Sequence, residues 1–222
     1  MSLTTRVMLV RHGATVLAAE DRFAGSSDVL LSEAGEMQVA RLSERLASKP
    51  IDAFYASPMK RTVRTAEVIA APHGRAVEAV DAFREINHGR WEQKTRAEVE
   101  ALYPDEYRQW ELDPFTFAPE GGESGLSTLA RALPALRAVV ERHAGQTVLV
   151  VSHKATIRLL LGTFLGFDLR GYRDHLDQSP AALNIIDFKE SRGRLMLFND
   201  ISHYEGVVPP RQGALSKTWD AK

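Results

Sequence analysis

The chain has 222 residues, of which 44% are hydrophobic and 26% are charged, and its 28 Lys and Arg residues nearly balance its 29 Asp and Glu residues. This balance argues against a protein that binds nucleic acid or an anionic membrane through its overall charge. There is no cysteine, which excludes disulfides, thiolate metal sites and cysteine nucleophiles, and no stretch approaches the roughly 20 apolar residues of a membrane span, so we expect a soluble, cytoplasmic protein.

Strand-like and helix-like segments alternate along the first third of the chain. Residues 7–10 form a short aliphatic run, Val-Met-Leu-Val, that predicts a buried strand. Ser32 is typical of the N-cap of a helix, which we expect to end near Ala47. The pattern then predicts a strand over 51–56, a helix that opens at Ser57-Pro58, and a short strand near Ala76 and Val77.

The middle of the chain has a different composition. Residues 86–123 are rich in aromatic side chains and proline, and we interpret them as a small helical insertion that packs beside the sheet and covers part of the site. The alternative is an ordinary long connection, although unstructured loops of this length are uncommon. A long helix over 126–143 is expected next, with a kink at Pro134.

The last part of the chain returns to alternation. A strand over 148–151 and a helix over 155–165 precede two strands, 183–188 and 194–198, which read as a hairpin turned by residues 190–193. Residues 206–222 are expected to form a surface tail. The whole chain, 1–222, therefore predicts one α/β domain with three layers, α/β/α, around a mainly parallel sheet that the hairpin extends at an antiparallel edge.

Two of the predicted strands end in a histidine. Arg11, His12 and Gly13 follow the first strand directly, and His153 follows the strand over 148–151. Gly13 allows a tight turn and leaves room for an anion to approach. Because the carboxyl ends of parallel strands lie on one edge of the sheet, where open α/β folds bind their ligands, we expect both histidines in one site.

The residue types that gather at this edge suit phosphoryl transfer. Arg11 and Arg61 could clamp phosphate oxygens, since a guanidinium group binds phosphate bidentately. One neutral histidine could attack phosphorus, and a second, cationic histidine could donate hydrogen bonds to the transition state. The N-terminus of the helix after His153 could add backbone N–H donors. Glu85 could protonate the leaving oxygen and later deprotonate the attacking water, although Glu92 and Glu123 are competing acids in the same region.

A series of short motifs runs through most of the chain in a fixed order: 9–13, 21–25, 31–35, 57–62, 65–66, 85 with 89–92, 121–124, 151–153, 157–158 and 199–203. The series resembles the histidine phosphatase superfamily, in particular the branch of cofactor-dependent phosphoglycerate mutases and related phosphatases. This resemblance implies that His12 is the phosphorylated nucleophile. It also implies that Arg11, Arg61 and His153 form the phosphate pocket, that Glu85 is the proton donor, and that no metal or other cofactor takes part.

Departures from the family pattern bear on the substrate. They are Ala14, Ala18, Gln93 and the pair Lys154-Ala155, and none of them removes a catalytic group. Lys154 could bind a second anionic group of the substrate. Further candidate substrate contacts are Thr15 and Arg22, whereas His88 and the remaining histidines are expected to be structural or solvent-facing.

The sequence therefore predicts a metal-independent phosphatase that acts on a small phosphorylated metabolite. The short segment from Gly89 to Glu123 resembles the phosphatases more than the mutases, whose insertion is larger. A phosphoglycerate mutase and a regulatory protein that binds phosphate without turnover are the alternatives. A metallohydrolase that uses His12 and His153 is a further alternative, but the sequence lacks the suitably spaced carboxylate and histidine ligands that such a site needs. The apolar helix faces are compatible with a homo-oligomer.

Overall fold

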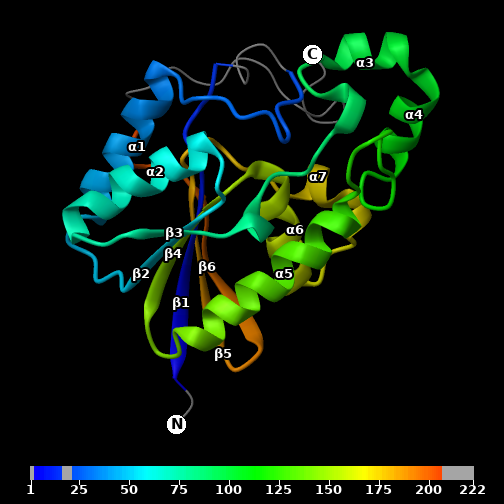
Figure 1. Cartoon of the computed structure of the whole chain (residues 1–222). Helices are drawn as coiled ribbons and strands as arrows, with labels where there is room; N and C mark the ends of the chain where they lie inside the picture. Colours follow the sequence, from blue (N-terminus) through cyan, green and yellow to red (C-terminus); the bar gives the residue numbers. More distant parts are fainter. Residues whose placement is uncertain (1–2, 17–21, 207–222) are drawn as a thin grey trace.

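A computed structural model describes residues 3–16 and 22–206, and a six-stranded sheet forms its centre (Figure 1). The strands lie in the order β3-β2-β4-β1-β5-β6. Four of them pair in parallel, and the last two form an antiparallel hairpin beside β1. This arrangement confirms the predicted fold class. The strands are β1 (Thr4–Arg11), β2 (Ala53–Ala56), β3 (Val77–Ala79), β4 (Thr147–Ser152), β5 (Leu183–Lys189) and β6 (Arg192–Asp200).

Helices cover both faces of the sheet. On one face α1 (Glu33–Leu46) and α2 (Lys60–Ala70) pack on the strands, and on the other face α5 (Gly125–Arg142) and α6 (Lys154–Leu165) do so (Figure 1). Successive side chains of a strand point to opposite faces. In β1, Val7 and Leu9 therefore join the cluster under α5 and α6, while Met8 and Val10 join the cluster under α1 and α2. A strand buried on both faces explains the continuous aliphatic run in the sequence.

The aromatic-rich segment forms the helical insertion that the sequence predicts near the site. It contains η4 (Gly89–Trp91), α3 (Arg96–Leu102) and α4 (Pro104–Leu112). Thr95 begins α3 with a capping box, and proline opens α4. We call α3 and α4 together the α3–α4 hairpin. Its helices pack on a small core of their own, which consists of Trp91, Val99, Tyr107 and Trp110 with Phe23, Tyr103 and Phe117 around them.

The helix that was expected to open at Ser57-Pro58 begins instead at Lys60. The Ser57 carbonyl accepts a hydrogen bond from the hydroxyl of Thr62, and the Ser57 side chain contacts His153. The helix is capped from elsewhere, since the Lys60 N–H donates to the carboxylate of Asp28 at 2.8 Å. A tertiary contact therefore sets this helix boundary.

Three other segments differ in detail from the expected pattern. Helix α5 continues through Pro134. Strand β6 begins at Arg192, so that Gly193 pairs with Phe188 and the hairpin turn is shorter than expected. Between α6 and β5 lie two short helices without a predicted counterpart, η5 (Leu169–Gly171) and α7 (Tyr172–His175). Ala18 and the tail from residue 207 lie outside the described residues.

No helix in the described ranges combines the length and the apolar character that crossing a membrane requires.

Candidate active site

A pocket lies at the carboxyl edge of β1 and β4, and the α3–α4 hairpin contributes part of its lining. Arg96 of α3 and Trp110 of α4 line it on the side of the insertion. His153 lies beside the pocket, fully buried, with its ring centroid 5.2 Å from that of His12. The structure thus brings all the expected site residues to one place. Those that line the pocket itself are Arg11, His12, Thr15, Arg22, Arg61, Glu85 and Lys154.

His12 is held in one tautomer. Its Nδ1 lies 2.7 Å from the carbonyl oxygen of Gly13, and because a carbonyl can only accept, Nδ1 carries the proton. Nε2 therefore keeps its lone pair. Burial, followed by the positive charges of Arg61 and Arg11, holds the pKa of His12 well below its usual value. The ring is neutral at pH 7, as a nucleophile requires.

The loop after His12 passes very close to the start of α1. A Cβ on Gly13 would lie 2.7 Å from the carbonyl oxygen of Gly35, and a Cβ on Gly35 would lie 2.1 Å from that of Ala14. The side chain of Gln38 accepts from the Ala14 N–H at 3.0 Å. Two glycines thus allow a backbone approach that fixes the position of His12.

His153 is neutral, contrary to the expectation of a cationic ring. Its side chain is fully buried, and this burial, followed by the positive charges of Arg61 and Arg11, lowers its pKa well below the usual value. Its Nε2 lies 2.8 Å from Oγ of Ser57. If the Ser57 hydroxyl donates in this contact, Nδ1 carries the proton and can donate to an anion. In the described part of the chain, Nδ1 has no hydrogen-bond partner.

Two buried arginines flank the histidines. Arg11 is 6% exposed and donates from Nη1 to the carbonyl oxygen of Gln178 at 2.6 Å. Arg61 is 1% exposed and donates from Nη1 and Nη2 to the carbonyl oxygens of Ser27 and Gly25. Burial lowers the pKa of Arg61, but a guanidinium group remains charged at pH 7. Its Nε has no hydrogen-bond partner among the described residues.

Glu85 occupies the N-terminus of α6. Its two carboxylate oxygens accept from the N–H groups of Ala155 and Thr156, at 3.1 and 3.2 Å, and from the Thr156 hydroxyl at 3.2 Å. The sequence suggested that the N-terminus of this helix could bind phosphate. That expectation is wrong for these two N–H groups, because they already donate their hydrogen bonds to Glu85.

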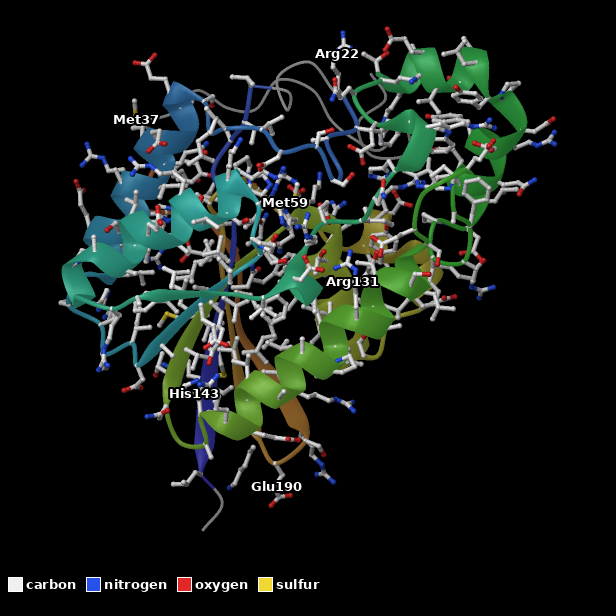
Figure 2. All side chains as sticks on the ribbon, in the orientation of Figure 1. Arg22, Met37, Met59, Arg131, His143 and Glu190 are labelled. Carbon is white, nitrogen blue, oxygen red and sulfur yellow. The ribbon has the colours of Figure 1, made fainter. Side chains whose placement is uncertain are left out.

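The competing acids lie elsewhere. Glu123 forms an ion pair, at 2.9 Å, with Arg131 of α5, which is labelled in Figure 2. This arginine also donates to the backbone carbonyls of residues 82, 84 and 85. Glu92 accepts hydrogen bonds from the backbone N–H groups of Ser26, Ser27 and His88. Of the carboxylates in the described residues, Glu85 alone lines the pocket.

The pocket wall carries a large excess of positive charge over that single carboxylate. Lys154 and Arg158 lie one turn apart on α6 and share the carboxylate of Asp177, at 4.0 and 3.5 Å. Arg22, which is labelled in Figure 2, also lines the pocket and pairs with Glu98 of α3. Such a wall suits an anionic ligand. The cationic lining residues are Arg11, Arg22, Arg61, Arg96, Lys154, Arg158 and Arg173.

Several lining residues were not predicted as site residues. Arg158 follows Lys154 by four positions, a helical spacing that could have identified it. Arg173 and Trp110 had no such signal, because their contact joins α7 to α4, with the guanidinium carbon 4.2 Å from the ring centroid. His88 was expected to be structural or solvent-facing; it lines the pocket, with its ring 4.8 Å from that of Phe23.

The buried histidines predict a loss of stability in acid. Between their lowered pKa values and the usual value near 6.5, the unfolded chain binds protons that the folded protein does not, so the free energy of unfolding decreases as the pH falls through this range. Each such histidine contributes up to about 1.4 kcal/mol per pH unit. Urea unfolding of the wild type and of His153→Gln, at about pH 7, 6 and 5, measures the slopes. We expect a shallower slope for the variant; equal slopes would contradict a neutral His153.

Across residues 3–16 and 22–206, no three His, Cys, Asp or Glu side chains gather in a way that could hold a metal ion.

Comparison with known proteins gives matches over most of the chain. A family model, histidine phosphatase superfamily (branch 1), matches residues 7–201. Phosphoserine phosphatase 1 from Hydrogenobacter thermophilus is 34% identical over 198 residues, covering 89% of this chain and 93% of that protein. "Probable phosphoglycerate mutase GpmB" from Yersinia enterocolitica is 34% identical over 190 residues, covering 84% and 86%. The solved structure of Bacillus stearothermophilus YhfR matches with a TM-score of 0.85 at 30% identity, covering 90% of this chain and 98% of YhfR.

Proposed function

This chain belongs to the histidine phosphatase superfamily, and from this premise we propose that its pocket hydrolyses a small phosphomonoester through a phosphohistidine formed on His12. One observation carries the proposal. The Gly13 carbonyl accepts a hydrogen bond from the Nδ1–H of His12, burial keeps the ring neutral, and the lone pair of Nε2 is therefore available beside buried arginines.

In the first step, Nε2 of His12 attacks phosphorus and the bond to the ester oxygen breaks. Arg11 and Arg61 hold the non-bridging oxygens, where negative charge gathers. His153 donates from Nδ1 to one of the same oxygens, with Ser57 donating to its Nε2. Glu85, which takes part in this step in its protonated form, gives its proton to the leaving oxygen, so that an alcohol departs and a phosphoryl group stays on His12.

In the second step, a water molecule attacks the phosphohistidine. Glu85, now a carboxylate, takes the proton of this water, and the bond between phosphorus and Nε2 breaks. Inorganic phosphate leaves, and His12 and Glu85 return to their starting protonation states. The same five residues serve both steps: Arg11, His12, Arg61, Glu85 and His153.

The rest of the substrate lies against the outer wall of the pocket. Thr15 and Arg22 contact it, and Lys154 binds a second anionic group, since this lysine is nearly buried in a wall with excess positive charge. Phosphoserine, after which the Hydrogenobacter relative is named, is one molecule of this class. We place the enzyme in the cytoplasm, where small phosphorylated metabolites are found and where a chain without cysteine is at no disadvantage.

Hydrolysis of an aryl phosphate in the presence of a chelator tests the proposal. We expect turnover that the chelator does not change and that vanadate inhibits, because vanadate adopts the five-coordinate geometry of phosphorus in transfer. Activity that the chelator abolishes and a divalent metal restores would favour a metallohydrolase. Phosphate binding without turnover over a broad panel of esters would favour a regulatory protein. Transfer between the positions of a phosphoglycerate, faster than hydrolysis, would favour a mutase.

A further inference from the structure

The guanidinium group of Arg61 is oriented by one short loop, residues 25–28. Its Nη1 donates to the carbonyl oxygen of Ser27 at 2.7 Å, and its Nη2 donates to that of Gly25 at 2.8 Å. A guanidinium group is planar, so two fixed acceptors define its plane. The 25–28 loop therefore sets the direction in which the remaining N–H groups of Arg61 can donate to a ligand.

The 25–28 loop is in turn held by Glu92 of the insertion. Oε1 of Glu92 accepts from the Ser26 N–H at 2.9 Å, and Oε2 accepts from the N–H and the hydroxyl of Ser27, at 3.1 and 2.7 Å. Oε1 also accepts from the N–H of His88 at 2.9 Å. The carboxylate thus bridges the loop and the segment that follows Glu85, and each of its oxygens accepts twice.

The fit between Glu92 and the 25–28 loop is close. Gly25 has a φ of +32°, and a Cβ at this position would lie 1.9 Å from Oε1 of Glu92. Backbone hydrogen bonds set the two segments in register, since Gln93 donates to the carbonyl of Phe23 at 2.7 Å and Phe23 donates to that of Lys94 at 3.0 Å. These backbone hydrogen bonds, made by the residues directly after Glu92, hold its carboxylate in place beside the 25–28 loop.

The same loop also holds the helix that carries Arg61. Asp28 accepts from the N–H of Lys60, the first residue of α2. The loop thus fixes both ends of the arginine, its backbone through Asp28 and its guanidinium group through the carbonyls of Gly25 and Ser27. The negative charge of Glu92 also counteracts the effect of burial on the pKa of Arg61, after the larger effects of Glu85 and Asp28.

We propose that Glu92 is a positioning residue for the phosphate site. It fixes the 25–28 loop, the loop fixes the plane of the Arg61 guanidinium group, and the insertion thereby controls how tightly a phosphoryl group is bound. The proposal rests on the proposed function only in that Arg61 holds the phosphoryl oxygens.

The test compares Glu92→Gln with Glu106→Gln. An amide has one acceptor oxygen, so Glu92→Gln removes the acceptor for two of the four hydrogen bonds. Glu106 is a matched control because it also anchors the insertion, through the indole N–H of Trp91 at 3.0 Å and through Arg90, but does not contact the 25–28 loop. Affinity for inorganic phosphate, measured by calorimetry, and kcat/KM for an aryl phosphate are determined for both variants. Thermal unfolding of both variants reports their stability.

We expect Glu92→Gln to weaken phosphate binding and to lower kcat/KM by about tenfold to a hundredfold, as a misoriented binding group does, while Glu106→Gln changes both by less than about threefold. In an Arg61→Ala background, Glu92→Gln should have no further effect, since the residue that it positions is gone. Equal effects of the two variants, or an undiminished effect without Arg61, would overturn the proposal. Phosphate binding answers the question even without turnover, so a failure of the proposed function would be recognised separately.

Discussion

Replacing His12 with alanine is expected to lower kcat by about 10⁴-fold or more for every phosphomonoester, the scale on which loss of a nucleophile acts. The neutral ring donates a hydrogen bond from Nδ1–H to the Gly13 carbonyl, so its Nε2 is free to form a bond to phosphorus. Steady-state kinetics of the variant measure the loss. Rapid quenching of the wild type should show one added phosphoryl group on the peptide that contains His12.

The binding site should survive this substitution, because the arginines are held by other contacts. Arg11 donates to Gln178, and Arg61 donates to the 25–28 loop. His12→Ala should therefore still bind vanadate or phosphate, as calorimetry can show. Turnover by the variant at the rate of the wild type would mean that another group attacks phosphorus.

Replacing Glu85 with alanine is expected to slow the hydrolysis of alkyl phosphates by about 10²–10⁴-fold, the range of general acid catalysis. An alkoxide is a poor leaving group and needs the proton, whereas a nitrophenolate leaves without one. For an aryl phosphate, formation of the phosphohistidine should therefore slow far less. Single-turnover release of the alcohol or phenol from the two kinds of ester measures this difference.

Arg61→Ala provides the contrast for this experiment. An arginine that binds the phosphoryl oxygens meets the same atoms in both esters, so its loss should slow both by the same factor. A Glu85→Ala variant that behaves in this way, without dependence on the leaving group, would assign the carboxylate a structural part at the N-terminus of α6 instead.

The elements that could be predicted from the sequence are those that local patterns encode. The aliphatic run of residues 7–10, buried on both faces, indicates a central strand, and the histidine that follows it lies at the carboxyl edge for that reason. The parallel pairing of β1 with β4 then brings His12 and His153 together. Both steps need only periodicity and the geometry of parallel sheets.

The features that could not be predicted depend on contacts between distant segments. The side chains of Ser57 and His153 form a hydrogen bond although they lie 96 positions apart in the chain, and no local sequence pattern predicts this contact. The protonation state of His153 depends on its burial beside the arginines, and this burial cannot be predicted from the sequence. The position of Glu85 could not be predicted either: it accepts hydrogen bonds from the N–H groups at the start of α6, which the sequence suggested for phosphate.

The α3–α4 hairpin has a consequence for how such enzymes diversify. It forms part of the roof of the pocket through Arg96 and Trp110, but it begins after the segment in which Glu92 holds the 25–28 loop. A lineage could therefore exchange the hairpin for another and acquire a new substrate while inheriting the phosphorus chemistry intact. One condition limits the exchange: because the ring of Trp110 packs 5.5 Å from that of Phe23, a replacement has to bury this phenylalanine against apolar side chains of its own.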